Sequence, residues 1–100
     1  MEFAQIRAFL VLSEELHFGR AAARLHISQP PLSRQIRALE EEVGTDLFER
    51  TSRTVRITPA GEAFRREARD ILARRDAAVA AALGAAGHHS GSIKIGFVGA

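Results

Sequence analysis

The sequence predicts a mainly α-helical fold in which three short helices and a two-stranded hairpin precede one long helix. Three observations lead to this fold. Apolar residues recur at helical spacing through the first 43 residues, a short alternating stretch follows a glycine, and a run of Ala, Arg, Glu, Leu and Asp begins near residue 59. These are the patterns of amphipathic helices, of short strands and of a continuous helix, respectively.

The first predicted element is an amphipathic helix from about Glu2 to Glu15. Its apolar residues are Phe3, Ile6, Phe9, Leu10 and Leu16. We expect the apolar side of this helix to pack behind the next two helices. A chain of 100 residues suffices for one small domain with an appendage, so a single core is expected.

The next two helices are separated by a very short connection. Their apolar residues at one-face spacing are Phe18, Ala21, Ala22 and Leu25 in the first and Leu32, Ile36, Leu39 and Val43 in the second. The connection from Leu25 to Ser28 leaves room only for a sharp turn. His26 stands there at a position where Gly often adopts the left-handed conformation, which His tolerates better than most residues. This is the pattern of a helix-turn-helix, whose second helix can enter a DNA major groove.

Two prolines stiffen the start of the third helix. Ser28 is placed as an N-cap, but Pro30 and Pro31 have no N–H for its hydroxyl to bind. We therefore expect the first regular turn near Pro30 or Pro31, with Gln29 on the approach. This end can present Gln29 and Arg34 to DNA, since Gln pairs with adenine and Arg with guanine. The alternative is an ordinary solvated helix start.

A short hairpin is expected after Gly44, which is placed to end the third helix. Its strands would run from Leu47 to Arg50 and from Val55 to Thr58. The residues that would face the core are Leu47, Val55 and Ile57. The polar tip from Thr51 to Thr54 has no Gly or Asn, so a longer loop is expected rather than a tight primed turn.

Such a hairpin beside a helix-turn-helix is a wing, and its arginines suggest a second DNA contact. Arg53 at the tip suits a narrow minor groove. Arg50 and Arg56 flank the tip, and Arg50 is the better placed for a phosphate. Arg20, at the start of the second helix, could reach another phosphate. The alternatives are that the wing arginines only protect sheet edges with charge and that Arg20 is simply solvated.

The last predicted element is a long helix that begins with Thr58 as N-cap and Pro59 in the first position and continues to about Ala86. Its apolar stripe consists of Phe64, Ala68, Ile71, Leu72, Val79 and Leu83. Because this helix would be longer than the small domain before it, the exposed part of its apolar stripe needs a partner. A second copy of the chain is the simplest one. The alternative is that the helix lies on a membrane surface.

The end of the chain suggests the beginning of another domain. Glycines from residue 84 to 91 break the long helix, and Ile93, Ile95 and Phe97 alternate like a strand that has no partner in the chain. The predicted organisation is a DNA-binding domain over residues 1–58, a linker helix over 59–87, and a hinge with the first strand of an absent domain over 88–100.

Composition excludes several classes of function. Cys is absent, which rules out disulfides and thiol chemistry. The residues show no Ser/His/acid constellation and no phosphate loop, and no acid or Cys completes a metal site beside His88 and His89, so we expect no enzyme and no metal. No apolar run has the length of a membrane span, and we expect a cytoplasmic protein. The net charge is only +2, but all except one of the 14 basic residues are arginine.

Several linked segments together resemble the N-terminal part of the LysR-type transcriptional regulators. They are MEFAQIRAFL, then FGRAAARLHISQPPLSRQIRALEEEVGTDLFER, then ITPAG at the start of a long helix. The resemblance implies that base-reading residues are Gln29, Pro30, Arg34 and, in the minor groove, Arg53. It implies backbone contacts from Pro31, Ser33, Arg37 and Arg50, to which we add Arg20 and Ser52 as DNA-contacting candidates.

The resemblance also implies partners. Regulators of this family bind pseudo-palindromic double-stranded sites near promoters, and their linker helices pair into a homodimer, with tetramers expected for a full-length parent in the bacterial nucleoid. A small-molecule inducer would bind the absent effector domain, and no cofactor is expected in this fragment. The alternative function is a protein-interaction module that uses the same fold for assembly only.

Overall fold

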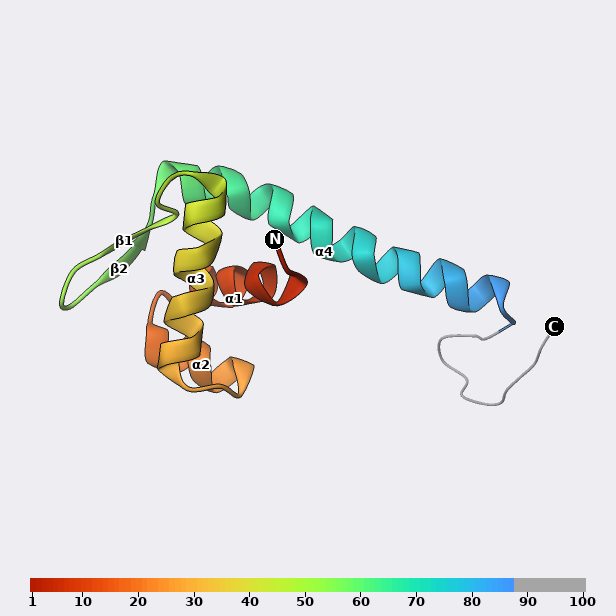
Figure 1. The fold of residues 1–100 in the computed structure, drawn as a ribbon, viewed down its shortest axis with the longest axis horizontal. Helices are drawn as coiled ribbons and strands as arrows, with labels where there is room; N and C mark the ends of the chain where they lie inside the picture. Colours follow the sequence, from red (N-terminus) through yellow and green to blue (C-terminus); the bar gives the residue numbers. More distant parts are fainter. Residues whose placement is uncertain (88–100) are drawn as a thin grey trace. The chain divides into compact units, whose positions relative to one another are not determined.

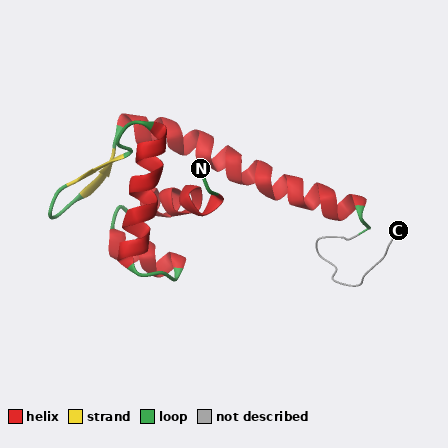
Figure 2. Cartoon of the chain, in the orientation of Figure 1, coloured by secondary structure: helices red, strands yellow, loops and turns green. Residues whose placement is uncertain are grey.

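The computed structural model describes residues 1–87. The elements, in chain order, are α1 (Phe3–Glu15), α2 (Phe18–Leu25), α3 (Gln29–Val43), β1 (Phe48–Arg50), β2 (Val55–Ile57) and α4 (Pro59–Ala85) (Figures 1 and 2). The predicted order of three helices, a hairpin and a long helix is confirmed. The strand expected around Ile95 lies outside the described residues.

A compact unit comprises residues 1–69, so its boundary falls inside α4. The sequence had placed the end of this domain at Thr58. The first turns of α4 belong to the unit because the Phe64 ring meets the Phe9 ring edge-on at 5.0 Å between centroids, and because Ala68 is fully buried. Ala68 therefore has no surface to offer a second chain, which corrects its assignment to a dimer seam, and Phe64 belongs at least partly to the core.

The core is built around Phe9 of α1. Besides Phe64, its ring contacts Phe48 of β1, with 5.3 Å between the ring centroids. The other large side chains that are fully buried are Ile6, Leu12, Leu32, Ile36, Leu39 and Leu47. Phe3 and Leu16, expected on the packed face of α1, are instead 48% and 38% exposed. Leu16 lies outside that face because it ends the helix in the left-handed conformation, with φ 51°.

The helix-turn-helix is formed as the sequence predicted. Ala21 and Ala22 are buried, at 0% and 3% exposure, which lets α2 pack closely. His26 ends α2 in the left-handed conformation, with φ 58° and ψ 39°. The chain then turns into α3, where the backbone N–H of Ile27 donates to the carbonyl of Ala22 at 3.0 Å.

The hairpin pairs Phe48 with Ile57 and Arg50 with Val55 in antiparallel register. Leu47, which was expected in the first strand, is buried just before it. The tip closes through the hydroxyl of Thr51, which accepts hydrogen bonds from the backbone N–H groups of Arg53 at 3.2 Å and Thr54 at 3.0 Å. The backbone N–H of Thr51 also donates to the carbonyl of Thr54 at 2.9 Å. No residue from Thr51 to Thr54 has a positive φ, so the turn is not of the primed type, in agreement with the prediction.

Candidate nucleic-acid interface

One face of α3 is buried and the opposite face is exposed. Leu32, Ile36 and Leu39 have no exposed surface. On the other face Pro30, Arg34 and Arg37 are exposed, and their spacing of four and three residues aligns them along the helix. The structure therefore places three of the predicted DNA-contacting residues of α3 on one exposed face, from the first turn of the helix to its middle.

The start of α3 differs slightly from the expectation. The helix begins at Gln29, one residue before Pro30, and Ser28 is its N-cap. The Ser28 side chain makes no capping hydrogen bond. This was expected, because Pro30 and Pro31 have no N–H to donate to its hydroxyl. Gln29 is exposed, while Pro31 and Ser33 are partly buried. All of the predicted residues at this end keep some accessible surface.

The wing tip carries the other predicted contacts. Ser52 and Arg53 are exposed, and Figure 1 shows the hairpin extending from the helical body of the unit. The backbone N–H of Arg53 is held by Thr51, so the position of the tip is defined although the Arg53 side chain lies in solvent.

A buried carboxylate joins α3 to the base of the wing. Glu40 is only 7% exposed. Its Oε2 accepts hydrogen bonds from the backbone N–H groups of Leu47 at 2.8 Å and Phe48 at 3.1 Å, and its Oε1 accepts one from Nη2 of Arg50 at 2.9 Å. This role was not predicted from the sequence. The signal available was that Glu40 follows Ile36 by four residues and so lies on the apolar stripe of α3.

Arg50 is held by more than its ion pair. Its guanidinium carbon lies 5.3 Å from the centroid of the Phe18 ring of α2, a distance typical of cation–π contacts. The Arg50 side chain is 29% exposed. The residue predicted to bind a phosphate thus also connects β1 with α2 and α3.

Arg37 and Arg50 line the same hollow between the end of α3 and the wing. Its volume is about 470 Å³, and its lining residues are Arg37, Glu40, Glu41, Gly44, Thr45, Asp46 and Arg50. Three carboxylates therefore lie beside the two arginines. This mixture does not resemble the apolar lining of a small-molecule site.

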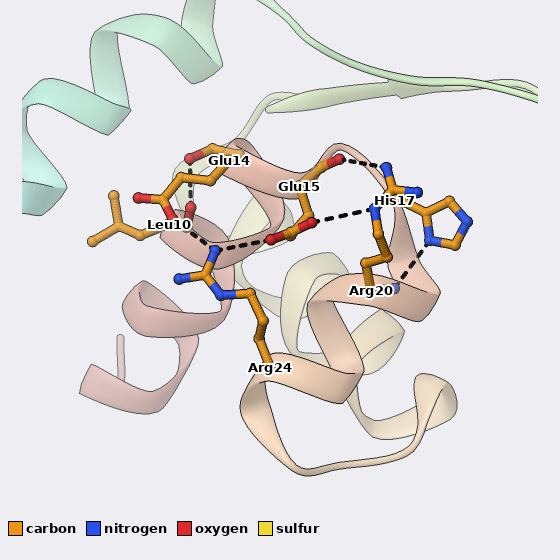
Figure 3. Close-up of polar contacts among 7 residues, drawn as sticks. Leu10, Glu14, Glu15, His17, Arg20 and Arg24 are labelled. Carbon is orange, nitrogen blue, oxygen red and sulfur yellow. Dashed lines mark hydrogen bonds and ion pairs between the residues drawn. The ribbon is translucent and has the colours of Figure 1, made fainter.

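Arg20 is paired within the chain. Its Nε contacts Oε1 of Glu15 at 3.2 Å, and its Nη2 donates to the backbone carbonyl of Glu15 at the same distance. Figure 3 shows this side chain and that of Arg24 reaching toward the carboxylates at the end of α1. Arg24 contacts Glu14 at 2.8 Å, and this hydrogen bond raises the pKa of its guanidinium. A phosphate contact by Arg20 would compete with Glu15.

The N-terminus of α2 has an unusual cap. Nδ1 of His17 accepts a hydrogen bond from the backbone N–H of Arg20 at 3.0 Å (Figure 3). Gly19 provides the space, because a Cβ at that position would lie 2.9 Å from the imidazole. The cap requires an unprotonated Nδ1.

Among the described residues, no group of three or more His, Cys, Asp or Glu side chains could hold a metal ion. Within the same part of the chain, no helix is both long and apolar enough to cross a membrane. His88 and His89, at which no metal site was expected, lie outside the described residues.

A comparison with protein families decides the identity. Residues 3–62 match the family described as bacterial regulatory helix-turn-helix proteins of the lysR family. The chain belongs to this family. The matched range includes α1, α2, α3, the hairpin and the first turn of α4. LysR-family proteins are regulators, not enzymes, in agreement with the sequence analysis.

Two relatives of the chain are likewise HTH-type transcriptional regulators. The chain is 53% identical over 96 residues to the HTH-type transcriptional regulator BudR of Klebsiella aerogenes, covering 96% of this chain and 67% of that protein. It is 50% identical over 97 residues to the uncharacterised regulator YnfL of Escherichia coli K12, covering 97% of this chain and 33% of that protein. This LysR chain therefore spans about a third of YnfL.

Solved structures of LysR-family domains share the fold. The CbnR_DBD–DNA complex matches with a TM-score of 0.83 and 42% identity, covering 86% of this chain and 99% of that one. The BenM_DBD complex with catB site 1 DNA matches with a TM-score of 0.82 and 45% identity, covering 89% of this chain and 100% of that one. This chain is thus a LysR-family N-terminal domain with the function of DNA binding.

Proposed function

We propose that this domain binds a pseudo-palindromic promoter site as a homodimer, with the start of α3 in the major groove and the wing in the adjacent minor groove. The observation that carries this proposal is the exposed row of Pro30, Arg34 and Arg37 opposite the buried face of α3. A helix that is anchored on one side and presents Arg on the other is suited to reading base edges.

The roles of the individual residues follow from their chemistry. Gln29 would pair with adenine, Arg34 with guanine, and the ring of Pro30 would contact a thymine methyl group. Arg53 would enter the minor groove. Pro31, Ser33, Arg37, Arg50 and Ser52 would contact the DNA backbone. Arg20 would do so only by giving up its contacts with Glu15.

Dimerisation is proposed through the second part of α4. Leu72, Val79 and Leu83 follow one another by seven and four residues and so share a face of the helix. Val79 and Leu83 are 47% and 45% exposed in the single chain, and Ile71, beside this row, is 36% exposed. A stripe of exposed aliphatic side chains on a long helix is favourable to pairing with a second copy.

The wider assignments rest on the family. The parent protein is proposed to form tetramers, to respond to a small-molecule inducer through a separate effector domain, and to act in the bacterial cytoplasm at the nucleoid. The regulators BudR and YnfL, of which this chain covers 67% and 33%, have more residues than this chain matches.

The test is selection of bound duplexes from a random pool, followed by binding measurements on a selected duplex and a random one. The change Arg34→Ala should weaken binding to the selected duplex by about 1–3 kcal/mol and relax base choice at one position. Arg7→Ala removes the same charge from an exposed position of α1 and serves as the matched control.

Two results would contradict the proposal. A chain that selects no common sequence and does not bind duplex DNA would instead be an assembly module, whereas DNA binding should weaken steeply as the salt concentration rises. Equal losses for Arg34→Ala on the selected and the random duplex would remove its base-reading role.

A further inference from the structure

We propose that Glu40 is a positioning residue that sets the placement of the wing relative to the recognition helix α3, and thereby the spacing of the two DNA contacts. This inference rests on the proposed function, because it concerns how the two DNA-contacting elements are held. Glu40 itself is 7% exposed and is not one of the proposed DNA contacts.

The carboxylate of Glu40 is fully engaged in its buried position. A buried charge is costly unless it is paired and hydrogen-bonded. Glu40 meets this requirement with three donors, all from the wing segment, namely the N–H groups of Leu47 and Phe48 and the guanidinium of Arg50. One side chain of α3 therefore holds the entry into β1 and the end of β1 together.

The wing itself is small. Each strand is three residues long, and a two-stranded hairpin of this size has little stability by itself. Its orientation must come from contacts with the helical body. Phe48 supplies an apolar contact with Phe9, which is non-directional, and Thr58 links the start of α4 to the carbonyl of Asp46. The three charge-assisted hydrogen bonds of Glu40 have defined directions and link the wing to α3.

Arg50 lies between the wing and the helix-turn-helix. The Arg50 side chain contacts both Glu40 and the ring of Phe18 in α2. The helix-turn-helix and the wing therefore meet at one guanidinium. A ligand that must contact both elements binds more tightly when their relative placement is set beforehand, since less ordering remains to be done on binding.

Two variants of Glu40 separate its contacts with the backbone N–H groups from its contact with Arg50. Glu40→Gln keeps an oxygen for the N–H groups of Leu47 and Phe48 but places an amide donor against the Arg50 donor. Glu40→Ala removes both sets of contacts. Glu41→Gln removes the same charge from the next residue, which is exposed, and controls for net charge.

The first measurement needs no DNA. The chain has no cysteine, so Ser52→Cys at the wing tip and Ala38→Cys on α3, both at exposed positions, accept a pair of spin labels specifically. Dilution with excess unlabelled chain restricts the recorded distances to one chain. We expect a distance distribution that is broadened moderately by Glu40→Gln, strongly by Glu40→Ala, and not by Glu41→Gln.

The second measurement uses unlabelled chain and a selected duplex, with and without one base pair inserted between the regions contacted by α3 and by the wing. The wild-type chain should lose about 5–150-fold in affinity on the inserted duplex, which corresponds to one misplaced base contact. Glu40→Gln should lose most of this discrimination. A purely structural role would lower the active fraction equally on both duplexes and leave the ratio unchanged.

The outcomes are separable. The inference is overturned if the Glu40→Ala chain folds and shows the wild-type distance distribution. If that variant does not fold, the inference is overturned by a Glu40→Gln chain that keeps either the wild-type distance distribution or the wild-type affinity ratio. Failure of the wild-type chain to bind duplex DNA would refute the proposed function but would leave the distance measurement valid.

Discussion

At Gly61, in the first turn of α4, the backbone approaches the hairpin closely. A Cβ at this position would lie 2.2 Å from the carbonyl oxygen of Leu47 and 2.6 Å from Cγ1 of Ile57. Nearby, Thr58 donates through its hydroxyl to the carbonyl of Asp46 and accepts from the N–H of Gly61, both at 2.9 Å. The start of α4 is therefore fastened to the wing by contacts that leave no room for a side chain.

Gly61→Ala should lower the free energy of unfolding by about 1–3 kcal/mol, because the carbonyl of Leu47 is backbone and cannot move aside as a side chain would. Urea unfolding monitored by circular dichroism measures this change. Gly84→Ala, also in α4, is the matched control, since a Cβ there meets nothing within 4 Å and Ala favours the helix. Equal destabilisation by the two substitutions would contradict the packing argument.

At the scale of elements, the helix ends account for the sharpness of the helix-turn-helix. The imidazole of His17 caps α2 at its start, and His26 ends it in the left-handed region. The first turn of α3 contains Pro30 and Pro31, which have no N–H groups to be capped. Histidines thus determine both ends of α2, which has 8 residues. The side chain of His17 caps its start, and the backbone of His26 ends it.

His17→Ala should lower the free energy of unfolding by about 1 kcal/mol, because the N–H of Arg20 loses its acceptor. His17→Asp should retain most of the stability, since Asp is a good N-cap and its charge suits the helix dipole. Thermal or urea unfolding of the three chains at neutral pH distinguishes them. If Ala and Asp behave alike, the cap does not contribute measurably to α2.

At the scale of the whole molecule, the proposed DNA recognition depends on two copies. A pseudo-palindromic site presents two half-sites, and a homodimer with two-fold symmetry matches them. The exposed aliphatic side chains of α4 from Ile71 to Leu83 lie beyond the first compact unit, which ends at Arg69. They can therefore pair without disturbing the core around Phe9.

Val79→Asp should convert the proposed dimer into a monomer, because it would bury an unpaired charge in the seam. Sedimentation equilibrium measures the mass. Ala81→Asp is the control, since two further residues turn the helix by about 200° and place the same charge on the opposite face. A seam through Val79 is wrong if the mass stays that of a dimer, or if both substitutions dissociate it.

Much of this LysR-family domain was predictable because it depends on local physics. The spacing of apolar residues indicates helices and their buried faces. Gly44 and His26, with φ 96° and φ 58°, are where a left-handed residue was expected, and Thr58 and Pro59 begin α4. The absence of Gly and Asn between Thr51 and Thr54 excluded a primed turn. Each of these properties involves residues a few positions apart.

Tertiary structure alone decided which polar side chains are engaged and where the core ends. Periodicity showed the faces of α3 but not that Glu40 receives donors from Leu47, Phe48 and Arg50. It grouped Ala68 with the residues of the dimer seam, although Ala68 is buried in the first unit. The physical reason is that burial and pairing depend on partners brought close by folding, whereas helix spacing and capping depend on the residues next to them in the chain.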